Sequence, residues 1–250
     1  MRKILLAGNW KMHGSKTMVN SLLQALLAGA ARKHEVDLAV FPPFPYLAQT
    51  QNILQGSAIA WGGQTLNPAS TGAHTGEVCA SMLMDFGCRY VLVGHSERRI
   101  LYGESDADVA LRFESAQKAG LEPVLCVGET LQQRERGETE DIVSQQLTAV
   151  IEHCGIAAFA SATIAYEPVW AIGTGKTATP DQAQVIHAFI RDKLGTLDDI
   201  ISSKIRILYG GSVNGGNAAD LFAREDIDGG LVGGASLKAE DFLAIRKAMA

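Results

Sequence analysis

Short apolar runs alternate with longer segments of helical periodicity along the whole chain. The runs are almost continuously apolar, which is typical of parallel strands that are covered on both faces. We therefore predict eight strands, at residues 3–10, 36–41, 58–63, 90–93, 121–127, 162–166, 205–209 and 229–232. The helices predicted between them include residues 17–32, 106–119, 139–153, 180–194 and 239–248.

Two of these helices have recognisable first residues. Thr179 is a residue type that caps helices, and Pro180 follows it. Proline suits the first helical position because its fixed φ is already helical. Ser105 and Asp108 give a weaker signal of the same kind. Both starts support the alternation of strands and helices.

About eight strand–helix units in 250 residues match the number and size of an α/β fold of the (β/α)8 barrel class. No linker or low-complexity segment interrupts the pattern, so we expect a single domain over residues 1–250. The alternative is an open doubly wound sheet. That fold usually has fewer strands and a glycine-rich first turn, whereas the first turn here is NWKMHG at residues 9–14.

A barrel places its functional groups directly after its strands, at the C-terminal face. Several polar residues of this chain follow that rule. Asn9 and Lys11 end the first predicted strand, His95 and Glu97 follow the fourth, Glu167 follows the sixth, and glycine pairs follow the seventh and eighth. Randomly dispersed side chains would not all fall at one end, so we predict a functional site there.

Residues 165–178, AYEPVWAIGTGKTA, place a carboxylate beside a loop of small residues. Pro168 pushes Glu167 toward an extended conformation at the end of its strand. Gly173 and Gly175 allow backbone N–H groups to approach a ligand closely. The segment therefore predicts a base with a lid.

Lys11 and His95 add a cation and a group for proton transfer. A cation at the barrel mouth holds an anionic substrate and stabilises an oxyanion as it forms. His95 opens a polar turn or a short helix, and a helix N-terminus carries positive partial charge that keeps the ring neutral. A neutral imidazole donates a hydrogen bond to a carbonyl and shuttles a proton between oxygens. Glu97 is either a solvated acid of the helix start or a residue that orients Lys11.

Glycines after the last two predicted strands indicate a phosphate site. Residues 210–211 are a glycine pair that leads into Ser212, and Gly233 and Gly234 precede another helical segment. Barrels hold phosphate with the loops after these two strands and with a helix N-terminus. One glycine pair is weak evidence because turns explain most such pairs, but pairs at two consecutive strand ends are stronger.

Composition narrows the class of partner. The 22 Lys and Arg residues against 27 Asp and Glu residues leave a formal net charge of −5, so nothing recommends nucleic acid or an anionic membrane. Cys79, Cys88, Cys126 and Cys154 form no C-x-x-C pair, and no His cluster has metal-ligand spacing. We expect small buried thiols in a reducing cytosol. The apolar run at residues 4–7 is too short for a signal peptide, and no run reaches membrane-spanning length, so a cytoplasmic protein is expected.

Five motifs, AGNWKM, GHSERR, AYEPVWAIGTGKTA, YGGSV and LVGGASL, resemble those of the triosephosphate isomerase family in the same order, over essentially the whole chain. The resemblance implies a TIM barrel that interconverts dihydroxyacetone phosphate and D-glyceraldehyde 3-phosphate through an enediolate, with no cofactor and no metal. It assigns Glu167 as the base, His95 as the neutral electrophile and Lys11 as the electrostatic stabiliser. Asn9 would help to polarise the substrate oxygen, and Glu97 would pair with Lys11.

The resemblance also implies which residues hold and cover the substrate. The substrate and its phosphate would be bound by Asn9, Lys11, Gly173, Ser212, Gly233 and Gly234. The lid would consist of Pro168, Val169, Trp170, Ala171, Ile172, Gly173, Thr174, Gly175, Lys176, Thr177 and Ala178. A closed lid would keep water away from the enediolate and prevent it from losing phosphate.

Residues 62–84 resemble the family's long third loop, which reaches into the partner subunit of a homodimer. Thr75 would then lie near the partner's active site. From its residues alone, the segment is a long loop that contains Gly and Thr. Thr65 stands where the family often has Asn, and His74 where it usually has an aromatic residue. Both departures concern the subunit interface rather than the catalytic residues.

Two alternatives stand beside the isomerase. Other phosphosugar barrels, such as an epimerase or an enzyme of tryptophan or histidine synthesis, share the phosphate glycines. They would not be expected to carry Lys11, His95 and Glu167 together. A barrel retained as a binding or scaffold protein would be expected to have lost at least one of these three residues.

Overall fold

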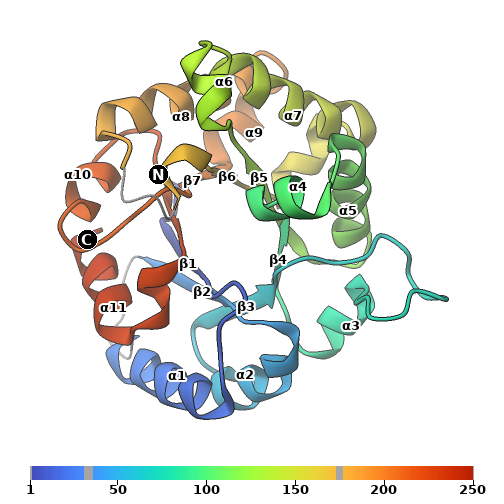
Figure 1. Cartoon of the computed structure of the whole chain (residues 1–250), viewed down its shortest axis with the longest axis vertical. Coiled ribbons are helices and arrows are strands. Elements are labelled where there is room, and N and C mark those ends of the chain that lie inside the picture. Colours follow the sequence, from blue (N-terminus) through green and yellow to red (C-terminus); the bar gives the residue numbers. More distant parts are fainter. Residues whose placement is uncertain (1, 31–35, 173–176, 250) are drawn as a thin grey trace.

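The computed structural model describes residues 2–30, 36–172 and 177–249. Its parallel strands are β1 Leu5–Asn9, β2 Asp37–Phe41, β3 Ile59–Gly63, β4 Tyr90–Val93, β5 Glu122–Val127, β6 Thr163–Tyr166, β7 Arg206–Tyr209 and β8 Gly229–Val232. They pair in sequence order, and β8 pairs with both β7 and β1, so the sheet closes (Figure 1). The predicted (β/α)8 barrel is therefore confirmed, and the alternative of an open sheet is excluded.

Helices form a ring outside the barrel (Figure 1). They are α1 Lys16–Ala30, α2 Leu47–Leu54, α3 Ala80–Asp85, α4 Ser96–Tyr102, α5 Asp106–Lys118, α6 Leu131–Glu135, α7 Thr139–Cys154, α8 Pro180–Gly195, α9 Asp199–Lys204, α10 Ala218–Phe222 and α11 Ala239–Ala248. Short 3₁₀ helices lie at Phe44–Tyr46, Ile156–Ser161, Val169–Ala171 and Gly234–Leu237. The five helices predicted from periodicity correspond to α1, α5, α7, α8 and α11; the predicted end of the first, at residues 31–32, lies outside the described residues.

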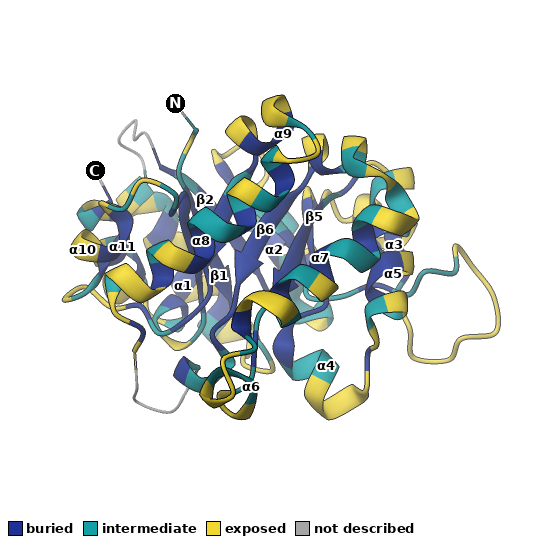
Figure 2. Ribbon diagram, turned by 90° about the horizontal axis from the view of Figure 1, so that it is seen from above, coloured by how far each residue is buried: buried dark blue, intermediate teal, exposed yellow. Residues whose placement is uncertain are grey.

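The strands are buried on both faces, which explains their continuous apolar runs. In β1, Leu5 and Ala7 belong to the core inside the barrel, and Leu6 belongs to the core between the barrel and the helices. On β2, Phe41 belongs to the core inside the barrel and Val40 to the core between the barrel and the helices. Side chains of a strand alternate between its faces, so one strand supplies both cores. Figure 2 shows the strands as a buried layer inside helices with exposed outer surfaces.

Capping boxes mark both helix starts that the sequence indicated. The Thr179 side chain accepts a hydrogen bond from the Gln182 N–H, and the Gln182 side chain accepts one from the Thr179 N–H. Ser105 and Asp108 make the same reciprocal pair at the start of α5. The Ser105 start is therefore as complete as the Thr179 start, although it was the weaker signal in the sequence. Its missing proline is offset by an Asp side chain that reaches back to the N-cap.

Residues 62–84 were predicted as one long loop, but only residues 64–79 lie outside a strand or helix. β3 extends to Gly63, and α3 begins at Ala80. Ala80 and Leu83 are three residues apart, lie on one face of this helix and are buried. Their packing stabilises the helix, whereas the Gly and Thr residues before it had indicated a loop. Between these elements, the projecting segment, residues 64–79, extends away from the barrel (Figure 1), and its residues 71–77 are exposed.

The cysteines are free thiols, as the sequence indicated. Cys79, Cys88 and Cys126 are buried, and Cys154 is half-buried. Within residues 2–30, 36–172 and 177–249, no helix is both long enough and apolar enough to cross a membrane. Over the same residues, no group of three or more His, Cys, Asp or Glu side chains is placed to hold a metal ion.

Candidate active site

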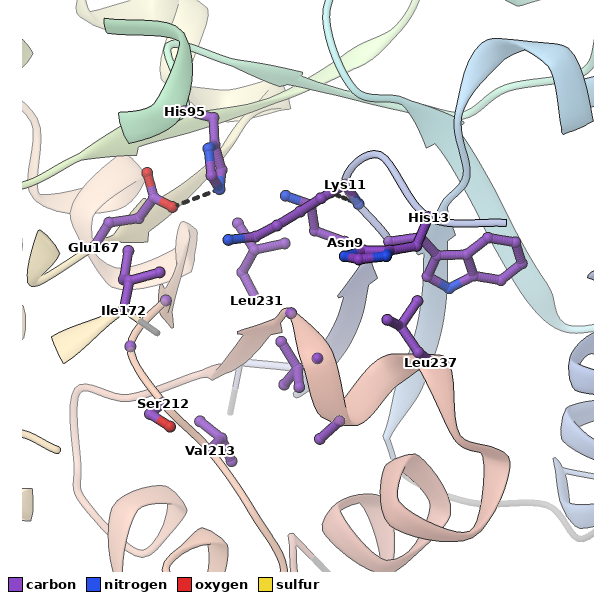
Figure 3. A pocket seen from close by; sticks show the side chains of 17 residues that line it. Asn9, Lys11, His13, His95, Glu167, Ile172, Ser212, Val213, Leu231 and Leu237 are labelled. Carbon is purple, nitrogen blue, oxygen red and sulfur yellow. Dashed lines mark hydrogen bonds and ion pairs between the residues drawn. The ribbon is translucent and has the colours of Figure 1, made fainter. Parts of the chain in front are cut away.

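A cavity of about 360 Å³ opens at the C-terminal ends of the strands. Its walls come from the segments that follow β1, β4, β6, β7 and β8 (Figure 3). The predicted site residues that line this site cavity are Asn9, Lys11, His95, Glu167, Ser212, Gly233 and Gly234. Glu97 and Thr75 are not among its lining residues. Glu97 instead contacts two residues that do line it, Lys11 and His95, and Thr75 is exposed on the projecting segment.

Glu167 follows β6 and is almost fully buried, with 2% of its surface exposed. Its Oε1 lies 2.9 Å from His95 Nε2, the contact drawn as a dashed line in Figure 3. Its Oε2 accepts a hydrogen bond of 2.8 Å from the Ser96 N–H, in the first turn of α4. A Cβ atom on Gly210 would lie only 2.9 Å from Glu167 Cγ, so the glycine after β7 leaves room for the carboxylate arm.

His95 is the N-cap of α4, so of the polar turn or short helix expected here the structure has the helix. Its Nδ1 accepts a hydrogen bond of 3.2 Å from the Glu97 N–H. A ring nitrogen that accepts carries no proton, so we assign the neutral tautomer with its proton on Nε2. Nε2–H then donates to the Glu167 carboxylate. The ring therefore aims one donor into the site cavity, and the helix N-terminus sets which nitrogen it is.

His95 and Glu167 shift each other's pKa. Burial lowers the pKa of His95, but the charge of Glu167 and the hydrogen bond to it act in the opposite direction and leave the pKa raised. Burial raises the pKa of Glu167, but the His95 contact and the Ser96 N–H outweigh it and leave the pKa lowered. The sequence interpretation considered only the helix N-terminus, which disfavours imidazolium. The raised pKa of His95 comes mainly from its contact with the Glu167 carboxylate, and the charge of Glu97 adds to it.

Lys11 follows β1 with a φ of 52°, in the left-handed region that costs an L residue about 1–2 kcal/mol. Polar side chains hold this conformation. Asn9 Oδ1 accepts from the Lys11 N–H at 3.0 Å, and Gln64 Nε2 donates to the carbonyl oxygens of Lys11 and Phe41, each at 2.8 Å. Lys11 Nζ lies 2.6 Å from Glu97, so a carboxylate holds the ammonium at the cavity wall.

The glycines after β7 and β8 form another part of the cavity wall. A Cβ on Gly211 would lie 2.2 Å from the Tyr209 hydroxyl, so only glycine fits there. Gly234 begins the 3₁₀ helix Gly234–Leu237, where the first N–H groups have no partner within the helix. A Cβ on Gly233 would lie 3.5 Å from Lys11 Cε, which shows that this turn and the lysine stem lie close together. A glycine turn and a helix start beside an ammonium group suit an anionic ligand.

The first part of the predicted lid is anchored to the barrel. Trp170, in the 3₁₀ helix Val169–Ala171, donates from Nε1 to Glu129 at 2.8 Å. Glu129 is fully buried and also accepts from the Tyr166 hydroxyl at 3.0 Å. Ile172 lines the site cavity. Gly173, Thr174, Gly175 and Lys176, which include the lid's predicted phosphate contact, lie outside the described residues.

Other residues of the site were missed by the sequence interpretation. His13, Val213, Leu231 and Leu237 line the cavity, and Gln64 and Glu129 hold Lys11 and Trp170 from outside it. Ser96 stands in the GHSERR motif among the polar residues after the fourth predicted strand, but its bond to Glu167 was not predicted. Gln64 and Glu129 had no such signal, because a single amide or carboxylate in a loop is usually a solvated residue.

Comparison with known proteins gives a consistent result over the whole chain. A family profile described as "Triosephosphate isomerase" matches residues 4–249. A "Triosephosphate isomerase" of Dechloromonas aromatica (strain RCB) is 60% identical over 248 residues, covering 99% of this chain and 99% of that protein. One of Thiobacillus denitrificans (strain ATCC 25259 / T1) is 59% identical over 250 residues, covering 100% of both. One of Nitrosomonas eutropha (strain DSM 101675 / C91 / Nm57) is 55% identical over 239 residues, covering 96% of this chain and 95% of that protein.

Proposed function

The chain belongs to the triosephosphate isomerase family and therefore interconverts dihydroxyacetone phosphate and D-glyceraldehyde 3-phosphate, and we propose that Glu167, His95 and Lys11 carry out the chemistry. The proposal rests on one observation. These three side chains converge on the site cavity beside two glycine turns (Figure 3). Other phosphosugar barrels share phosphate glycines, but the combination of this base, imidazole and ammonium favours proton transfer next to a carbonyl.

Glu167 acts as the base. Its carboxylate takes a proton from the carbon next to the substrate carbonyl, the electrons of the broken C–H bond form a C=C bond, and the carbonyl oxygen becomes an enediolate oxygen. Both carboxylate oxygens accept hydrogen bonds from His95 and Ser96, so the carboxylate has to leave these donors before it can reach carbon. Once separated from His95, Glu167 loses the contact that lowers its pKa while it remains buried, and it becomes a stronger base.

His95 and Lys11 stabilise the charge that this step creates. The Nε2–H of a neutral imidazole donates to the enediolate oxygen, and the ring moves a proton between the two neighbouring oxygens. Lys11 supplies positive charge at the same wall, and Asn9 orients the lysine main chain and polarises the substrate oxygen. Glu97 holds the ammonium in place without contacting the cavity. Return of the proton from Glu167 to the other carbon completes the isomerisation.

Backbone N–H groups hold the substrate phosphate. We assign this role to Ser212, Gly233 and Gly234, supported by their place in the cavity wall and by the helix that begins at Gly234. We further propose that residues 168–178 form a lid. The support is that Ile172 lines the cavity and that Trp170 is anchored on Glu129. A closed lid excludes water and prevents the enediolate from eliminating phosphate.

An assay in deuterated water tests this function. The protein is given D-glyceraldehyde 3-phosphate, and reduction of the dihydroxyacetone phosphate formed is followed with a coupling enzyme. We expect rapid conversion with deuterium from the solvent at carbon 1 of the product, because a carboxylate that carries the proton exchanges it with solvent. Conversion without any deuterium would contradict the expected exchange of the transferred proton with solvent, and a lack of conversion would contradict the function itself.

We infer that two copies of the chain form a homodimer. Exposed apolar side chains gather on α4, where Ile100, Leu101 and Tyr102 have 56%, 70% and 69% of their surface exposed. Exposed apolar patches of this kind mark interaction surfaces. The projecting segment, residues 64–79, extends from the barrel (Figure 2), and its exposed part, residues 71–77, offers a means of reaching a second copy. We also infer a cytoplasmic location, which suits the free thiols.

A charge on α4 is expected to separate the two subunits. In Leu101→Glu, a carboxylate would have to be desolvated in an apolar interface, which is costly without a partner. We expect light scattering to report a dimer for the unmodified protein and a monomer for this variant, with about tenfold or greater loss of activity at low concentration. Leu197→Glu is the control, because Leu197 is also exposed, at 52%, but lies between α8 and α9. An unmodified protein that stays monomeric at every concentration would contradict the homodimer.

A further inference from the structure

A buried glutamine outside the site cavity holds the backbone beside the catalytic glutamate. Gln146 lies on α7 and is 9% exposed. Its Oε1 accepts a hydrogen bond of 2.8 Å from the Gly128 N–H, and its Nε2 donates one of 3.2 Å to the Gly128 carbonyl oxygen. One side-chain amide therefore satisfies both backbone polar groups of one residue in the segment after β5.

Gly128 needs such a partner because the barrel ladders stop before it. The pairing of β4 with β5 ends at Val93 and Leu125, and the pairing of β5 with β6 ends at Val127 and Tyr166. A carboxamide presents the same donor and acceptor as a peptide group. Gln146 therefore takes the place of the strand residue that would continue the ladder, and it extends the ordered backbone of β5 by one residue toward the site.

Gly128 in turn lies directly against the main chain of Glu167. A Cβ atom on Gly128 would lie 1.8 Å from the Glu167 carbonyl oxygen and 2.6 Å from its carbonyl carbon. Hydrogen bonds tie the two segments on either side of this contact. The Glu167 N–H donates to the Val127 carbonyl at 2.7 Å, and the Val169 N–H donates to the Glu129 carbonyl at 3.1 Å. A shift of the Gly128 peptide would therefore move the main chain that carries the base.

On its other side, Glu167 is supported by the barrel itself. Gly210 donates from its N–H to the Tyr166 carbonyl at 2.7 Å, and a Cβ there would meet Glu167 Cγ at 2.9 Å. The base thus stands between two glycines. The one after β7 is bonded to the neighbouring strand, and the one after β5 is bonded to the side chain of Gln146.

We propose that Gln146 is a positioning residue for catalysis: its amide fixes Gly128 and thereby sets the position of Glu167, although it lines no part of the site cavity. The proposal rests on the proposed role of Glu167 as the base. It differs from a general packing role because it predicts which kinetic constant changes. Ser212, Gly233 and Gly234, to which we assign the substrate phosphate, follow β7 and β8, whereas Gly128 and Glu167 follow β5 and β6, so substrate binding is retained while proton transfer slows.

Gln146→Met tests the proposal by removing both hydrogen bonds at nearly constant side-chain volume. A misplacement of about 1 Å costs about 10²-fold in rate, so we expect kcat to fall about 10- to 100-fold with KM within about threefold of the unmodified value. Gln145→Met is the matched control. Gln145 is the adjacent residue of α7, is exposed and bonds to Asp106 at 2.9 Å. Equal kcat values for the two variants would overturn the proposal.

Gln146→Glu gives a second readout that also serves if the Met variant does not fold. An ionised carboxyl accepts from the Gly128 N–H but repels its carbonyl oxygen, whereas the protonated form restores the donor. Burial raises the pKa of a carboxyl, so we expect the kcat ratio of Gln146→Glu to unmodified protein to rise severalfold from about pH 8 to about pH 6. A ratio that stays constant over this range, in a variant that unfolds like the unmodified protein, would overturn the proposal.

The kinetics of Glu167→Asp distinguish a failure of this proposal from a failure of the proposed function on which it rests. If Glu167→Asp turns over like the unmodified protein, Glu167 is not the base and Gln146 has no catalytic group to position. If Glu167→Asp is impaired while Gln146→Met is not, the base assignment stands and the positioning role fails. Impairment of both, with KM retained in the Gln146 variant, supports both.

Discussion

Glu167→Asp is expected to lower kcat by about 10²-fold or more, because shortening the side chain by one methylene moves the carboxylate back by about 1 Å. The structure makes the residue sensitive to such a change. Glu167 has 2% of its surface exposed and lies against Gly128 and Gly210, so its main chain has little freedom to follow a shorter side chain. Folding should survive, since a smaller side chain creates no clash. KM should change little because the phosphate groups are not altered.

The measurement is steady-state kinetics in both directions, with thermal unfolding of each variant in parallel. Glu167→Gln is the informative companion, because it keeps the length of the side chain but cannot accept a proton at neutral pH. We expect its kcat to fall further than that of Glu167→Asp. Turnover at the unmodified rate in Glu167→Asp would rule out a role for this carboxylate as the base.

Lys11→Met is expected to lower kcat by about 10²- to 10³-fold, the usual effect of removing one group that stabilises a developing oxyanion. Met preserves most of the length and apolar surface of the lysine stem but removes its charge. The ammonium, held 2.6 Å from Glu97, is also a cation beside the anion site. We therefore expect KM to rise as well, so that kcat/KM falls further than kcat.

Lys16→Met is the control for Lys11→Met, because Lys16 is exposed at the start of α1 and does not line the site cavity. Both variants are measured at several salt concentrations. The KM of the unmodified protein should rise with salt, because salt screens attraction between the lysine and an anionic substrate. This dependence should weaken in Lys11→Met and persist in Lys16→Met. Equal kinetic constants in the two variants would contradict the role assigned to Lys11.

Strand positions were predictable because a strand that is buried on both faces is a continuous apolar run in the sequence. β4 and β8 have the predicted bounds, and β1 is shorter than predicted, at Leu5–Asn9. The helix α3 was not predicted, because its six residues are too few to show periodicity and its stability comes from packing of Ala80 and Leu83. Short elements of this kind depend on contacts that a local pattern does not contain.

The clustering of the candidate site residues was also predictable from the sequence. Lys11, His95 and Glu167 each follow a predicted strand, and the C-terminal ends of barrel strands meet at one face. Their mutual arrangement was not predictable. The bond between Glu167 and Ser96 joins residues 71 positions apart in the chain. The bond from Gln64 to the strained Lys11 spans 53 positions, and the bond between Gln146 and Gly128 spans 18.

By itself, the sequence determined the barrel, the face that carries the site and the residue types that the reaction needs. The barrel follows from burial of the strands on both faces, the face from the order of the strands, and the residue types from side-chain chemistry. None of these changes when individual atoms move by small distances. Only the tertiary structure decided which donors hold the base, how His95 is oriented and which supporting residues matter. These depend on hydrogen bonds, which are lost when groups move by less than 1 Å or so. The residues proposed to do the chemistry can therefore be named from the sequence, whereas those that hold them in position appear only in the folded chain.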